Sequence, residues 1–167
     1  MVGKNDFPKK GITDEEFRVR EQLIELGIPF DIDFAICFEC SGRFVISKGV
    51  YPNKCAKCGI VYTKEGQYCL PDFQIYHKNL PIRSGIIEVN GNVHDKVDRQ
   101  KKDRIKIEKL QKLGYAVFVI HANLFKNLPN MLLRLLLWSM YLCLNNTALY
   151  DISIKGEKEL FILTGKK

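Results

Sequence analysis

The chain has 167 residues, of which 46% are hydrophobic, and it carries a formal charge of +7 with an isoelectric point near 9.1. This length allows one domain with a small addition and excludes two full-sized domains. The positive charge favours a polyanionic partner, nucleic acid before an anionic membrane. The N-terminus lacks an apolar signal segment, and the longest apolar stretch, 131–144, is shorter than the roughly 20 residues of a membrane span. We therefore expect a cytoplasmic protein without a membrane partner.

The first part of the chain predicts a helix followed by a strand. Residues 13–26 place apolar side chains at helical spacing. Thr13 and Glu16 form a capping-box pattern at its start, and Gly27 is placed to end it. Residues 30–36 alternate as a strand does and lead directly into a cysteine motif.

Four cysteines form two CxxC pairs, separated by fourteen residues, at Cys37, Cys40, Cys55 and Cys58. Two thiolates at this spacing can turn toward one ion, and four of them complete a tetrahedral shell for Zn²⁺. The intervening SGRFVISKGVYPNK predicts a strand, a turn and a return strand, which is the layout of a zinc ribbon. Two disulfides or a redox pair are the alternatives, and a reducing compartment disfavours the first. We expect one structural Zn²⁺ per chain.

The middle of the chain predicts a β-α-β unit. Short apolar runs predict strands at 60–62, 68–76 and 85–89, with a turn at 80–84. A charged helix at 97–113, closed by Gly114, precedes a second apolar strand at 115–120. A helix between two buried strands is a crossover connection, so part of the sheet should be parallel.

The last third of the chain predicts a helix and a hairpin. Leucines cover more than one side of a helix at 131–145, which predicts that it lies in the core or in a homodimer interface. Residues 149–154 and 159–163 flank a polar KGEK turn as the strands of a hairpin.

Polar side chains interrupt several of these apolar elements. Asp72 follows a proline within a strand, and Glu88 lies in the apolar run GIIEV, where an ionised carboxylate is costly unless it is paired or bound to metal. Two carboxylates at the ends of adjacent strands predict a Mg²⁺ site. His94 lies six residues beyond Glu88 and suits a general base.

Two further acids lie on the apolar sides of predicted helices. Asp103 shares a face with Ile107 and Leu110, although a solvated acid in a charged helix is the alternative. Glu16 shares a face with Val19 and Leu23, although its capping role alone also explains it.

With these residues in view, the chain resembles the PD-(D/E)xK nuclease superfamily, within it the branch of very-short-patch-repair and EDxHD homing endonucleases. The resemblance runs from about residue 13 to 125. It rests on Thr13-x-x-Glu16, Pro71-Asp72-Phe73, Ile87-Glu88-Val89-Asn90-Gly91-x-x-His94, Lys102-Asp103 and Leu113-Gly114-Tyr115. Asn90 replaces the lysine of the ExK motif, and the cysteine ribbon lies outside the shared core.

The resemblance implies an α/β fold, a restriction-endonuclease-like mixed sheet flanked by helices. It implies one nuclease-like domain over 1–167, with a core of about 12–36 and 68–167 and an inserted ribbon at 37–62. The reaction would be Mg²⁺-dependent endonucleolytic hydrolysis of DNA. Its catalytic residues would be Glu16, Asp72, Glu88, Asn90, His94 and Asp103, with Mg²⁺ on Asp72 and Glu88.

Basic side chains in the ribbon and in the 97–113 region are the expected contacts to phosphates. They are Arg43, Lys48, Lys54, Lys57, Lys96, Arg99, Lys102 and Lys106. The alternatives are a zinc-ribbon protein that binds nucleic acid on a decayed nuclease fold without cutting it, and an RNA nuclease.

Overall fold

The computed structural model describes residues 12–46, 53–62, 67–77, 79–90, 97–121, 125, 128–146, 148–151 and 162–163. Three long helices are α1 (Asp14–Leu26), α2 (Val97–Lys112) and α4 (Asn130–Cys143). The strands are β1 (Phe30–Asp31), β2 (Phe34–Cys37), β3 (Arg43–Val45), β4 (Tyr68–Cys69), β5 (Phe73–His77), β6 (Leu80–Asn90), β7 (Ala116–His121) and β8 (Ile162–Leu163). The mixed α/β class expected from the sequence is confirmed.

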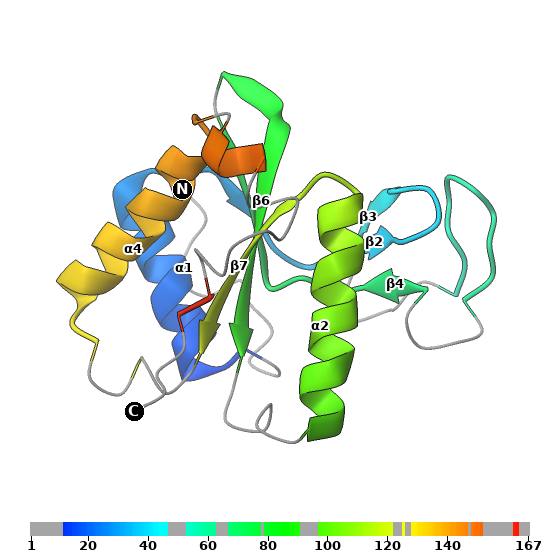
Figure 1. Ribbon diagram of the computed structural model, residues 1–167, viewed down its shortest axis with the longest axis horizontal. Helices are drawn as coiled ribbons and strands as arrows, with labels where there is room; N and C mark the ends of the chain where they lie inside the picture. Colours follow the sequence, from blue (N-terminus) through cyan, green and yellow to red (C-terminus); the bar gives the residue numbers. More distant parts are fainter. Residues whose placement is uncertain are drawn as a thin grey trace.

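Five strands form a mixed sheet, the large sheet, in the order β1-β5-β6-β7-β8. Strand β6 pairs antiparallel with β5 and parallel with β7, so the crossover through α2 has the predicted form. Helices α1 and α4 cover one face of this sheet, and α2 lies on the other (Figure 1). The large sheet is therefore enclosed by helices on both faces.

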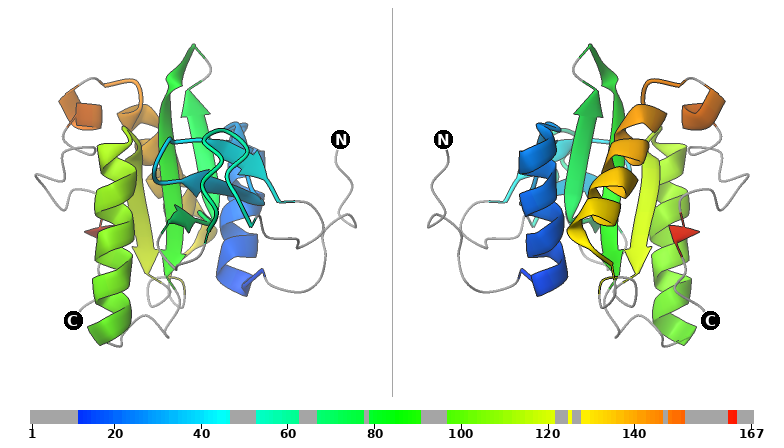
Figure 2. Two further views of the ribbon diagram at one scale, coloured as in Figure 1. Left: turned by 90° about the vertical axis from the view of Figure 1, so that its right-hand side faces the viewer. Right: turned by 90° about the vertical axis from the view of Figure 1, so that its left-hand side faces the viewer.

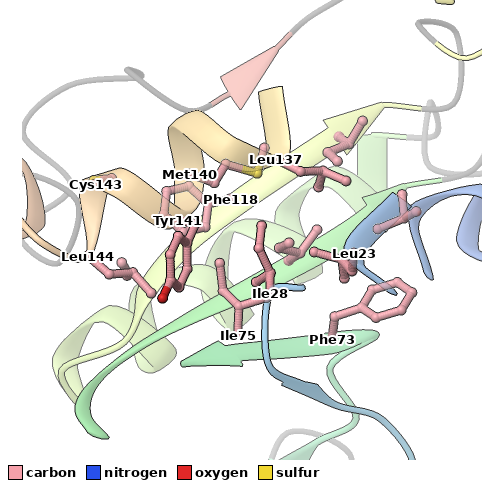
Figure 3. Packing of buried hydrophobic residues seen from close by; sticks show 14 of the residues in the cluster. Leu23, Ile28, Phe73, Ile75, Phe118, Leu137, Met140, Tyr141, Cys143 and Leu144 are labelled. Carbon is pink, nitrogen blue, oxygen red and sulfur yellow. The ribbon is translucent and has the colours of Figure 1, made fainter. Parts of the chain in front are cut away.

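The first core lies between the large sheet and helices α1 and α4. The fully buried Val19 and Leu23 of α1 meet Leu137 and Met140 of α4 over the sheet residue Phe118. Figure 3 shows Leu23, Leu137, Met140 and Phe118 among the side chains that converge from the helices and the strands. The predicted capping box is present, because Thr13 and Glu16 exchange hydrogen bonds, and Gly27 ends α1 in the left-handed conformation at φ 63°.

Three short strands, β3-β2-β4, form a second sheet, the small sheet. Phe34 and Ile36 of β2 and Cys69 of β4 join Leu110 of α2 and Val117 of β7 in a second core. The small sheet and α2 lie on the same side of the large sheet in Figure 1, the side that faces the viewer in the left view of Figure 2. The small sheet is thus packed onto the domain through a shared core.

The structure corrects four local predictions. The strand expected at 30–36 is two strands, β1 and β2, that belong to different sheets. The strand expected at 68–76 is two strands in different sheets, because Pro71 and Asp72 separate β4, which pairs with β2, from β5, which pairs with β1 and β6. The turn expected at 80–84 is part of the long strand β6. Residues 148–151 are helical and β8 pairs parallel with β7, so the expected C-terminal hairpin is wrong where the chain is described.

Helix α4 buries one side in the first core and exposes the other. Leu133 and Leu137 are fully buried, so the prediction of a core position is confirmed for this side. An apolar stripe faces outward and consists of Met131, Leu135, Trp138 and Leu142. The homodimer expected from such leucines stays a prediction. Within the described residues, the helices are too short or too polar to span a membrane.

Candidate metal centre and acid cluster

The four predicted zinc ligands converge in one place, the cysteine cluster. The Sγ atoms of Cys37 and Cys58 are 3.9 Å apart and those of Cys40 and Cys55 are 3.5 Å apart, and all four lie within 4.8 Å of one another. A tetrahedral Zn²⁺ with Zn–S bonds of about 2.3 Å places its sulfurs about 3.8 Å apart. The cluster could therefore hold a metal ion such as zinc, whereas a disulfide requires about 2 Å.

The surroundings of the cysteine cluster favour a thiolate at Cys55 and disfavour one at Cys40, where burial raises the pKa to about 12. The backbone N–H of Gly42 donates to Cys40 Sγ at 3.3 Å, and a Cβ at this position would be in tight contact with that sulfur, at 3.0 Å. Backbone N–H groups of Cys58 and Lys57 lower the pKa of Cys55 to about 6. The buried hydroxyl of Tyr62 has no hydrogen-bond partner among the described residues, and burial, followed by the nearby Cys37 and Cys55, raises its pKa. A hydroxyl in this position can donate to metal-bound sulfur.

A second polar group lies where β5 begins and β6 ends. Asp72 Oδ2 accepts a hydrogen bond of 2.7 Å from the backbone N–H of Val89. The side chain of Asp72 is therefore fixed against β6, next to Glu88. The pairing of β5 with β6 begins at Phe73, opposite Ile87. Beyond it, the carboxylate of Asp72 accepts the hydrogen bond of Val89 N–H that a backbone carbonyl would otherwise accept.

Glu88 lies on the α2 side of β6 and is 7% exposed. Its Oε2 atom accepts a bond of 2.6 Å from Lys106 Nζ, whereas Oε1 is buried and has no hydrogen-bond partner within the described structure. Burial raises the pKa of Glu88 to about 7, with Asp72 and Asp103 adding to the rise while Lys106 opposes it. A buried carboxylate oxygen without a partner is costly, and a bound cation would satisfy it.

Lys106 is the central cation of this group. Besides Glu88, its ammonium donates to the carbonyl oxygen of Leu70 at 3.4 Å. Burial acts to lower the pKa of Lys106, but Glu88 more than offsets this effect, and the net shift is upward. The sequence predicts Lys106 as a phosphate contact, and the structure shows that its ammonium is bonded to Glu88. Its position three residues after Asp103 and four before the buried Leu110 could have indicated this.

Glu16 and Asp103 complete the group, here called the acid cluster, whose members are Glu16, Asp72, Glu88, Asp103 and the cation Lys106. Burial raises the pKa of Glu16, and the charge of Asp72 raises it further. Asp103 is half-buried and acts on Glu88 in the same way. Among the described residues, the cysteine cluster is the one group with three or more metal ligands within 4.8 Å, so the acids approach one another more loosely.

Of the two remaining predicted catalytic residues, the structure describes Asn90 but not His94. Asn90 ends β6, is 9% exposed and pairs in register with His121 of β7. His94, the predicted base, lies outside the described residues. Val117 and Val119 face the second core, so by alternation His121 lies on the same side of the sheet as Glu88. His121 is therefore a histidine that the structure places at the end of the sheet where β6 ends.

The predicted phosphate contacts are dispersed. Arg43 pairs with Asp31 at 2.5 Å and lies over the ring of Phe34, while Lys57 donates to the carbonyl of Cys40 at 3.1 Å. Lys54 and Lys102 are exposed. The side chains of Lys48, Lys96 and Arg99 lie outside the described part of the chain. A role in binding nucleic acid stays a prediction for all of these residues.

Comparison of the chain with protein-family models, with curated proteins and with solved structures found no match. The class of protein that the structure defines is thus a mixed α/β domain with a four-cysteine cluster.

Proposed function

We propose that this chain is a Mg²⁺-dependent endonuclease that hydrolyses phosphodiester bonds in DNA, built on a restriction-endonuclease-like core of the PD-(D/E)xK superfamily. The observation that carries the proposal is the acid cluster, in which carboxylates from α1, from the start of β5, from β6 and from α2 act on one another. The buried, unpartnered Oε1 atom of Glu88 supports a cation there, since Mg²⁺ prefers carboxylate oxygens.

Asp72 and Glu88 would hold Mg²⁺ in this proposal, and Glu16 would contact the ion through a bound water molecule. The bound ion would polarise the scissile phosphate and stabilise the charge that develops on it. Asp72 is already oriented by its bond to Val89 N, which lowers the cost of arranging the site.

His94 is the proposed general base, with Asp103 orienting it or stabilising its charge. It would take a proton from water as the water oxygen bonds to phosphorus and the bond to the leaving oxygen breaks. Lys106 would take over the role of the motif lysine that Asn90 replaces. Its ammonium lies among the acids, where it would stabilise the phosphate oxygens.

A plasmid assay tests this proposal. The full chain should nick supercoiled DNA with Mg²⁺ or Mn²⁺ and not with EDTA. Asp72→Ala and His94→Ala should abolish nicking while binding of DNA persists, because phosphate contacts come from lysines and arginines. Glu108→Ala removes an exposed acid from α2 and serves as the matched control.

The other outcomes identify the alternatives. Binding without cleavage under all metal conditions would favour a non-catalytic nucleic-acid-binding protein. Cleavage of an RNA substrate with intact plasmid would favour an RNA nuclease. If His94→Ala cuts at the wild-type rate and His121→Ala does not, the base is His121.

A further inference from the structure

The cysteine cluster and the acid cluster are joined by a very short piece of chain. Strand β4 pairs with β2, with Tyr68 opposite Cys37 and Cys69 opposite Ile36. The next residue after β4 is Leu70, whose carbonyl accepts from Lys106, and Asp72 follows two residues later. The segment that supplies the acid cluster is therefore fixed to the strand that carries the first cysteine ligand.

A second connection runs through Phe38, which lies inside the first CxxC motif. Its backbone N–H donates to the carbonyl of Gln67 at 3.0 Å, just before β4. Its ring packs against the second core, and the ammonium of Lys109 lies 4.9 Å from the ring centroid. Lys109 is three residues after Lys106 on α2, so the first cysteine motif contacts the helix that positions the cation of the acid cluster.

We propose that a metal ion in the cysteine cluster positions Leu70, Asp72 and Lys106, and so sets the affinity of the acid cluster for a divalent cation. A two-residue strand such as β4 does not hold its pairing alone in water. The cysteine cluster ties together the two motifs that flank β3, the first of which begins at the end of β2, and its loss releases the support of β4. The carbonyl of Leu70 then no longer accepts from Lys106, and Asp72 loses its fixed position against Val89.

This inference rests on the proposed cation site at Asp72 and Glu88, but it does not require that the chain cut DNA. It makes the two metal sites thermodynamically coupled, so that Zn²⁺ at one site strengthens binding of Mn²⁺ or Mg²⁺ at the other. The coupling acts in both directions and typically amounts to a factor of 5 to about 150.

The first test measures Lys106 directly. Lysines of the full chain are reductively methylated with ¹³C, and the NMR signal of Lys106 is assigned with Lys106→Arg. Removing zinc should shift this signal and leave that of Lys112, an exposed lysine on the same helix, in place. An unchanged Lys106 signal in zinc-free protein would overturn the proposal.

The second test measures the coupling. Binding of Mn²⁺ is followed by electron paramagnetic resonance with zinc-loaded and zinc-free protein after the chelator has been removed, because Mn²⁺ prefers oxygen ligands to thiolates. The dissociation constant for Mn²⁺ should rise by about tenfold without zinc. Equal dissociation constants would show that the sites are independent and would contradict the proposal.

A matched pair of variants separates coupling from simple loss of zinc. Phe38→Ala keeps all four cysteines but removes the contact with the second core, and it should weaken Mn²⁺ binding and shift the Lys106 signal. Glu39→Ala changes the exposed neighbour in the same motif and should do neither. A Phe38→Ala protein that binds zinc and Mn²⁺ like the wild type would refute the connection. All readouts omit nucleic acid, so failure to cut DNA affects only the proposed nuclease.

Discussion

The cysteine cluster and the acid cluster are near neighbours in space, yet the chain builds them in different ways. Each pair of cysteines is separated by two residues, so the local turn alone brings their sulfurs together. The acid cluster draws Glu16, Asp72, Glu88 and Lys106 from four separate elements. The first site depends on local geometry and could hold a metal ion, whereas the second depends on the packing of the whole domain. The predictions below test this difference.

The largest effect is expected from loss of the metal in the cysteine cluster. Elemental analysis should find about one Zn per chain, and Cys55→Ser should unfold the small sheet, because structural zinc contributes on the order of 10 kcal/mol in small zinc domains. Hydrogen exchange should then show loss of protection in β2 and β3 and retained protection in β6 and β7. A zinc-free protein with a protected small sheet would contradict the assignment of the cluster.

Neutralising Lys106 should have the next largest effect, this time on the acid cluster. Lys106→Met leaves Glu88 buried without its cation and should reduce the rate of DNA cleavage about 100-fold, which is typical for the loss of one charge-stabilising group. Lys112→Met, on the same helix, should cut like the wild type. A small effect of Lys106→Met on cleavage, together with lost stability, would assign Lys106 a structural role.

How far the sequence predicted these sites follows from the same difference. The spacing of Cys37 and Cys40 predicts a shared ion without knowledge of the fold. In the same way, the four residues from Thr13 to Glu16 predict the start of α1. Asp72 and Glu88 were predicted because carboxylates are unusual in apolar strands. The sequence does not predict that Lys106 contacts Glu88, because α2 carries many lysines. Only the packing of α2 against β6 distinguishes this one.

The wrong predictions of strands and turns have a physical cause as well. The residues 68–76 have the composition of one strand, but the carboxylate of Asp72 replaces a backbone partner and sends the two halves into different sheets. The residues 80–84 include a proline and a serine that suggest a turn, yet they extend β6 at the end of the sheet. Tertiary contacts override local preference at both places.

The raised pKa of Glu88 predicts that stability falls with rising pH, opposite in sign to the effect of the lowered pKa of Cys55. Between its ordinary pKa of 4.5 and its folded value of about 7, the folded protein keeps a proton that the unfolded chain has released. The free energy of unfolding should therefore fall as the pH rises through this window, by up to about 3 kcal/mol. Denaturant titrations from pH 4.5 to 8 should show this slope in the wild type and in Glu108→Gln, and lose it in Glu88→Gln. Equal slopes for Glu88→Gln and the wild type would mean that Glu88 titrates normally.

The smallest effects come from adding one methyl group to each region. A Cβ at Gly85, in the middle of β6, would lie 2.7 Å from the ring of Phe118, so Gly85→Ala should lower the stability of the whole domain by about 1–3 kcal/mol. A Cβ at Gly42 would lie 3.0 Å from Cys40 Sγ and 3.3 Å from Cys55 Sγ. Gly42→Ala should therefore weaken zinc binding, measured by competition with a chromophoric chelator, while the unfolding midpoint of the large sheet stays close to that of the wild type. The same methyl group would then act globally in the large sheet and locally at the cysteines. If Gly42→Ala lowered the stability of both sheets equally, the cysteine cluster would depend on the packing of the whole domain as the acid cluster does.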